Sequence, residues 1–171
     1  RVRPIANERH FHRSLPYLYG QEERHGTAFD ELHDGSSLLE LLGMRMGAPW
    51  LWDRVHAAFP RLTRDMLLAW LNAPHLDAAA CDLRHLPDAA AATWGVGSLR
   101  GWSRAHVRAR RVAVKMLDRL APGADVTAAL GIPKRSGVRY RLAAVSDAEL
   151  RAVELQLKHR DVLTRRQEAK L

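Results

Sequence analysis

The sequence predicts an all-α protein, a compact multi-helix domain, and three observations lead to this fold class. Apolar residues recur at helical spacing in several stretches, and Pro, Gly or a capping residue bounds most of them. No alternating Val- and Ile-rich run of the kind that forms strands occurs in the sequence. The chain has 171 residues, 47% of them hydrophobic, which is enough for one compact domain or two small ones.

The first predicted helices lie before residue 95. Ser37 and Glu40 have the spacing of a capping box, which predicts a helix over residues 37–46. Pro49 suits the first turn of the next helix, and Thr63 can cap the one after it. The helix at Pro49 is expected over residues 50–59 and the helix capped by Thr63 over residues 63–72. Two short helices are expected at residues 76–84 and 87–94, and residues 1–22 are expected to form an irregular arm.

The five tryptophans all lie between residues 50 and 102, mostly on apolar helix faces. We expect them to form an aromatic cluster in the core, because each ring buries a large apolar area. A small-ligand pocket among them is the alternative. They are Trp50, Trp52, Trp70, Trp94 and Trp102.

The longest helical pattern covers residues 99–120 and carries two stripes. The apolar stripe predicts that Trp102, Val112 and Met116 are buried. Asp118 is the only acid in the pattern, so the second stripe lacks the carboxylates that a merely solvated helix usually carries one turn away. This basic stripe consists of Arg100, Arg104, Arg108, Arg111 and Lys115.

Charge divides the sequence into two regions. Residues 1–99 hold 10 Lys and Arg against 12 Asp and Glu, whereas residues 100–171 hold 17 against 7, a net charge of +10. Counterion release favours clustered Lys and Arg on a polyphosphate, so we expect an anionic partner to meet the second region. We therefore divide the chain into residues 1–97, a helical assembly and core region, and residues 98–171, a basic nucleic-acid-binding region.

Residues 128–142, AALGIPKRSGVRYRL, join two predicted helices by a tight turn. Asp125 caps the first helix, which ends at Leu130. Gly131 suits a left-handed turn position, and Ile132 suits an apolar plug between the helices. Pro133 would start the second helix, whose buried face is expected to be Val138 and Leu142.

This segment resembles the helix-turn-helix superfamily over about twenty residues. The resemblance implies that the second helix reads the major groove of DNA. We interpret the long basic helix as a scaffold that also contacts the DNA backbone. Arginine can bind guanine bidentately and lysine is typically a phosphate contact. Thr127 stands where the family usually has a small residue, Gly137 lies inside the second helix, and the spacing from Gly131 to Val138 is one residue longer than usual. The implied contact residues are Lys134, Arg135, Ser136, Arg139 and Arg141.

A last helix of roughly twenty residues is expected after Ser146, which forms a second capping box with Glu149. Leu150, Val153 and Leu157 lie on one face of it. That face could pair with its copy, as a helix-turn-helix dimer on two half-sites requires, so a homodimer or larger complex is expected.

The other patterns do not favour catalysis, a metal or a cofactor. His10 and His12 would need an extended chain to share a metal, and no further ligand has a convincing spacing. Cys81, the one cysteine, lies among alanines and suits a small buried filler in a reducing cytoplasm. The sequence has no phosphate-cradling Gly-Lys-Ser/Thr loop and no run of apolar residues long enough for a membrane span. We expect a cytoplasmic protein that is not an enzyme, binds no cofactor or metal and does not enter a membrane.

Two functions fit these observations. The first is binding of duplex DNA by a bacterial or phage transcriptional regulator or DNA-handling subunit. The alternative is a non-enzymatic assembly subunit, such as a secretion or phage machinery adaptor or a subunit of an RNA-guided complex, whose basic half binds RNA or an acidic protein surface. In that case Gly131–Pro133 is an ordinary helix corner. Only a DNA reader needs residues 134–141 rigid and exposed.

Overall fold

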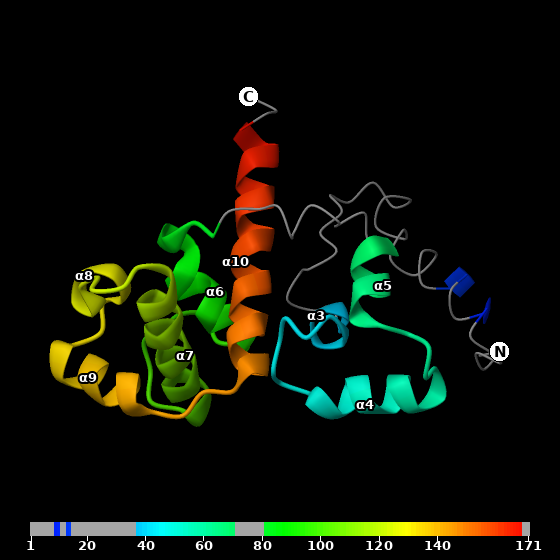
Figure 1. The fold of residues 1–171 in the computed structure, drawn as a ribbon, viewed down its shortest axis with the longest axis horizontal. Coiled ribbons are helices and arrows are strands. Elements are labelled where there is room, and N and C mark those ends of the chain that lie inside the picture. Colours follow the sequence, from blue (N-terminus) through cyan, green and yellow to red (C-terminus); the bar gives the residue numbers. More distant parts are fainter. Residues whose placement is uncertain (1–8, 11–12, 15–36, 71–80, 169–171) are drawn as a thin grey trace.

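The computed structural model describes residues 9–10, 13–14, 37–70 and 81–168, and every regular element in residues 37–70 and 81–168 is a helix. The all-α prediction is confirmed. The helix α10 crosses the middle of the molecule, with α3–α5 on one side and α6–α9 on the other (Figure 1). In chain order the elements are α3 (Leu38–Leu41), α4 (Pro49–Ala58), α5 (Arg64–Trp70), the 3-10 helix η2 (Leu83–His85), α6 (Leu86–Thr93), α7 (Arg104–Leu120), α8 (Val126–Leu130), α9 (Lys134–Leu142) and α10 (Asp147–Glu168).

Three predicted helix caps are confirmed. The Thr63 hydroxyl accepts a hydrogen bond from the amide three residues further on at 3.1 Å, and the Asp125 carboxylate accepts from the amide two residues further on at 2.8 Å. At the start of α10, the Ser146 amide donates to Glu149 at 2.8 Å while the Glu149 amide donates to the Ser146 hydroxyl at 3.3 Å. These bonds satisfy amides that have no partner inside their own helices.

The capping box expected at Ser37 is wrong. Ser37 makes no side-chain cap within the described residues, and α3 ends after four residues instead of reaching residue 46. Glu40 instead accepts a hydrogen bond from Arg45 at 3.3 Å. Gly43 adopts a left-handed conformation with φ +73°, which turns the chain away from the helix axis.

Two apolar cores meet at α10. The larger core draws on α6–α10, and the smaller one contains residues of α3 and α5 together with Leu155 of α10. The Gln156 amide also donates to the backbone oxygen of Met44 at 3.2 Å. Since α6 contributes to the larger core, residue 97 divides the chain by charge and not by packing.

The long basic helix begins at Arg104 and not at residue 99. Ser103 caps it, and Gly101 has a φ of +135°, which an L residue rarely adopts, so the preceding residues form a loop. As a result Trp102 is 96% exposed, which contradicts its predicted burial. Val112 and Met116 are buried as predicted.

The predicted aromatic core is also wrong, because leucines and one methionine fill the smaller core and mainly leucine, alanine and valine fill the larger one. Trp50 and Trp102 are exposed, and Trp52 and Trp94 are only partly buried. Several indoles instead lie under guanidinium groups, in the geometry of a cation–π contact. The guanidinium carbon lies 5.8 Å from the ring centre for Arg54 and Trp50, 4.6 Å for Arg64 and Trp52, and 5.2 Å for Arg108 and Trp94.

The face of α10 that we expected to pair with a second copy is covered inside the chain. Val153 and Leu157 are fully buried in the larger core, and Leu150 packs against it. Their helical spacing reflects this intramolecular packing. A homodimer would therefore need a surface other than this face.

Candidate nucleic-acid interface

The turn between α8 and α9 consists of Gly131, Ile132 and Pro133. Gly131 has the expected left-handed conformation, with φ +64°, and its amide donates to the Thr127 oxygen at 2.9 Å. Ile132 is buried, as expected for a plug. The Thr127 hydroxyl donates a hydrogen bond to the backbone oxygen of Ile132 at 3.0 Å, so Thr127 stabilises the turn.

The buried side of α9 differs from the sequence-based expectation. Gly137 and Tyr140 are its buried residues, whereas Val138 and Leu142 are 51% and 84% exposed. A Cβ on Gly137 would lie 3.1 Å from Cγ1 of Val126, so a glycine lets α9 approach α8 closely. The buried position therefore comes one residue earlier than we expected.

This close approach gives a stability prediction. We expect Gly137→Leu to lower the free energy of unfolding by about 1–3 kcal/mol, because the new side chain must displace Val126. Adding Val126→Ala should recover part of the loss, since it makes room at the contact. Urea denaturation of the two variants measures both effects. A loss unchanged by Val126→Ala would contradict the contact.

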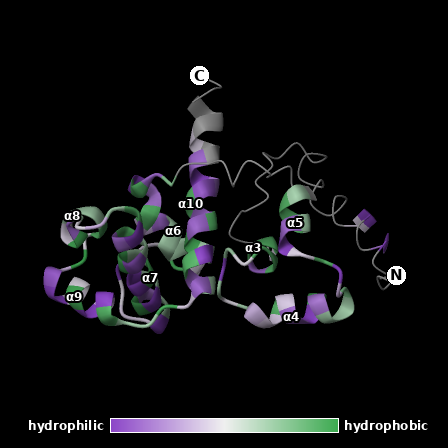
Figure 2. Ribbon diagram, in the orientation of Figure 1, coloured by the Kyte–Doolittle hydropathy of each residue, from purple (hydrophilic) through white to green (hydrophobic). Residues whose placement is uncertain are grey.

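The opposite side of α9 is basic. Its exposed residues follow helical spacing and so lie on one side of the helix. They are Lys134, Arg135, Val138, Arg139 and Leu142, while Ser136 is partly buried. Figure 2 shows α9 as largely hydrophilic and α7 as a mixture of hydrophilic and hydrophobic residues. Because α9 contains no acidic residue, no charge within the helix opposes the positive charge of its exposed side.

Arg141 does not belong to this exposed side. Its Nε donates to both carboxylate oxygens of Asp118 at 3.0 and 3.1 Å, and both side chains are partly buried. The expectation that Arg141 is an exposed contact residue is therefore wrong, since its spacing faces it toward α7. The ion pair also neutralises the only acid of α7.

The basic stripe of α7 lies next to α9. Arg104, Arg108 and Arg111 are exposed as expected, and Lys115 is partly buried. Asp118 follows Lys115 by one helical turn, so its ion pair with Arg141 brings α9 alongside the stripe. Arg100 is exposed too, but it lies on the loop before α7. We call the exposed arginines of the α7 stripe and the exposed basic residues of α9 the basic surface: Arg104, Arg108, Arg111, Lys134, Arg135 and Arg139.

Arg110 holds α9 to the loop before α7, a role that the sequence did not reveal. Its Nη1 donates to the backbone oxygens of Leu99 and Gly101, both at 2.8 Å, and its Nε donates to the Tyr140 hydroxyl at 3.2 Å. The sequence offers one weak signal: Arg110 belongs to neither the basic nor the apolar stripe of the helix, so its position on the helix lies outside both. Its partners are separated from it by 9 to 30 residues, so no local pattern could identify them.

The charges around Tyr140 change its acidity. Burial raises the pKa of the Tyr140 hydroxyl, but hydrogen bonds from Arg110 and Arg139 and their charges oppose this, and the net shift of the pKa is downward. The guanidinium of Arg139 also lies 5.2 Å from the centre of the ring. Tyr140 thus connects an exposed arginine of the basic surface to the partly buried Arg110.

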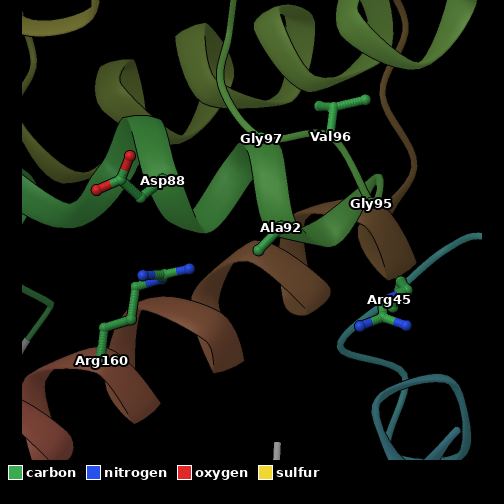
Figure 3. A pocket seen from close by; sticks show the side chains of 7 residues that line it. All are labelled: Arg45, Asp88, Ala92, Gly95, Val96, Gly97 and Arg160. Carbon is green, nitrogen blue, oxygen red and sulfur yellow. The ribbon is translucent and has the colours of Figure 1, made fainter. Parts of the chain in front are cut away.

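A cavity of about 420 Å³ lies between α6, the turn after it and α10. Arg45 and Arg160 line it from well-separated positions, together with Asp88 (Figure 3). Asp88 adds a negative charge to the lining, and Arg45 is paired with Glu40 at 3.3 Å, so positive charge is not concentrated here as a phosphate site requires. None of its seven lining residues is a tryptophan, so it does not correspond to a pocket among the indoles.

The remaining candidate chemistry is sparse in the part of the chain that the structure describes. That part contains no group of three His, Cys, Asp or Glu side chains that could hold a metal, and His12, His25 and His33 lie outside it. Burial and then the Glu154 carboxylate raise the pKa of the Cys81 thiol, which keeps it protonated and a poor nucleophile. Over the same residues, no helix has both the length and the apolar character to cross a bilayer.

Comparisons of this chain with protein-family models, with curated proteins and with solved structures find no match.

Proposed function

We propose that this protein binds duplex DNA through α9, with α7 contacting the phosphate backbone, as a transcriptional regulator or DNA-handling subunit in the cytoplasm. The observation that carries the proposal is the exposed side of α9. Three basic residues project from this side, while the opposite side of the helix packs against the rest of the protein. At nine residues α9 is about 14 Å long, a size that the major groove admits.

A DNA-reading helix must be rigid, because base contacts depend on the placement of its side chains. Four features support this in α9: the Gly131 turn, the Thr127 hydrogen bond, the contact of Gly137 with α8 and the Arg141–Asp118 ion pair. None of them uses the exposed basic residues. The buried side of α9 is thus held by the rest of the protein, and its basic side is exposed to solvent.

The proposal predicts two kinds of variant. Arg135→Ala should lower affinity for a preferred duplex by about 1–3 kcal/mol and relax preference at a single base position. Arg104→Ala should weaken binding to all duplexes alike and reduce the slope of log K against log salt by about one, as the loss of one phosphate contact does. Fluorescence anisotropy at matched salt measures both. Arg61→Ala, an exposed arginine outside the basic surface, is the control.

A second candidate function is the assembly subunit, whose basic surface meets RNA or an acidic protein. It is favoured by the exposure of Val138 and Leu142 among the basic residues of α9, since apolar side chains strengthen protein interfaces. A salt titration with duplex DNA, single strands and structured RNA separates the two functions. If both arginine variants bind every duplex as tightly as the parent, the DNA proposal fails.

A further inference from the structure

We infer that the loop of residues 98–103 is a second DNA contact, at which Trp102 stacks on an unpaired base. The inference rests on the proposed DNA binding and specifies its substrate: DNA in which a duplex adjoins an unpaired base, at a single-stranded end or a bulge. It starts from the most exposed large apolar side chain in the described part of the chain, since Trp102 is 96% accessible.

The loop that carries Trp102 is held in place from several sides. Arg110 donates to the backbone oxygens of Leu99 and Gly101, both at 2.8 Å. The Arg100 amide donates to the Ser98 hydroxyl at 3.2 Å. The indole is therefore exposed although its loop is held in place, because the backbone around Trp102 makes hydrogen bonds to the rest of the protein.

Gly101 and His106 add to this fixation. A Cβ on Gly101 would lie 2.5 Å from the His106 ring, so the backbone presses directly on the imidazole. The Ser103 hydroxyl and His106 Nδ1 are 2.7 Å apart, within hydrogen-bond distance. Trp102 lies between Gly101 and Ser103, so both neighbours are fixed while its own side chain points into solvent.

A fully exposed indole leaves a large apolar area in water, which folding alone does not favour. Both faces of the ring are open, and its neighbours Arg100 and Arg104 are exposed as well. An aromatic ring flanked by cations is the combination that binds unpaired bases, since the ring stacks on the base and the cations contact the backbone. The positive charges of Arg100 in the loop and Arg104 at the start of α7 favour a nucleic acid over another apolar surface.

The position of the loop connects this contact with α9. Arg110 bonds the Gly101 oxygen and the Tyr140 hydroxyl at once, so the loop lies beside the helix that we propose to enter the groove. In a duplex, the faces of paired bases are covered by their neighbours, and an indole reaches one only where the stack opens. A single DNA that combines a duplex with an unpaired base can therefore engage both α9 and Trp102.

Fluorescence anisotropy with three DNAs of one duplex sequence tests this inference: a blunt duplex, the duplex with a single-stranded extension and the duplex with one unpaired base. We expect the parent to prefer the last two. Trp102→Ala should lower affinity for those two by about 5- to 100-fold and leave the blunt duplex unchanged. Trp102→Phe should retain most of the preference, since a phenyl ring also stacks.

Trp50→Ala is the matched control, because Trp50 is also an exposed indole but lies on α4. Circular dichroism verifies the fold of each variant. If Arg135→Ala weakens all three complexes while Trp102→Ala weakens none, or weakens all three equally, the stacking inference is overturned and the proposed function stands. If the parent binds none of the DNAs, the proposed function fails and the stacking contact fails with it.

Discussion

We expect Leu157→Ala to lower the free energy of unfolding by about 2–5 kcal/mol, the usual cost of a cavity at a fully buried leucine. Leu157 has no exposed surface and lies in the larger core, where α10 packs against α6 and α7. The same helix supplies Leu155 to the smaller core. The loss should therefore reach both cores, because neither can keep its packing once α10 has moved.

Urea denaturation followed by two signals measures this effect. Far-UV circular dichroism reports all helices, and tryptophan fluorescence includes the signal of Trp52, which packs against the smaller core. We expect Leu157→Ala to shift both transitions to the same lower urea concentration. A fluorescence transition that stays at the parent midpoint while the dichroism shifts would show that the cores unfold separately. Leu155→Ala provides the reciprocal test from the smaller core.

The second large effect is expected at Arg110. Arg110→Met keeps much of the side-chain length but removes the donors to Leu99, Gly101 and Tyr140, and we expect it to lower the free energy of unfolding by about 2–3 kcal/mol. Arg111→Met is the matched control, since this neighbouring arginine is exposed. Urea denaturation compares the two. Equal losses would contradict the assigned role of Arg110.

The same substitution has a titration signature. Burial raises the pKa of Tyr140 while Arg110 and Arg139 lower it, so Arg110→Met should raise this pKa. The pH titration of the phenolate absorbance measures the change, and Tyr17 and Tyr19 cancel in the difference between variant and parent. The ionised phenol stabilises the parent only at alkaline pH: because its folded pKa is lowered, the contribution is lost as pH falls through that value. The neutral-pH loss at Arg110 is thus due to hydrogen bonds and not to this shift.

Local signals in the sequence predicted several features that depend on a few neighbouring residues, although the same kind of signal at Ser37 and Glu40 failed. The caps at Thr63, Asp125 and Ser146 and the left-handed Gly131 are of this kind, since each is decided within four residues. The basic stripe was predicted because its period continues over a long helix. The exposure of its arginines follows directly from that period.

Two of the features that failed depend on distant contacts, and the third, the start of α7, is a local cap that the continuous apolar spacing obscured. In α9 the apolar residues Val138, Tyr140 and Leu142 are two residues apart, and this spacing does not define one face of a helix. The buried side is instead determined by the fit of Gly137 against Val126 of α8. The helical pattern before residue 104 was continuous, yet Ser103 caps the helix and the backbone of Gly101 turns the chain. Arg110 was missed because its bonds join segments that only the fold brings together.

The position of α10 has a consequence for synthesis of the protein. Its Gln156 reaches back to Met44 over 112 residues, and its Leu155 and Leu157 serve different cores. The ribosome synthesises α10 after all the helices that α10 contacts. When α3–α5 and α6–α9 emerge, the apolar surfaces that α10 later covers are therefore still exposed to water. Neither half of the nascent chain can complete its core before α10 has emerged, so both depend on the same late helix.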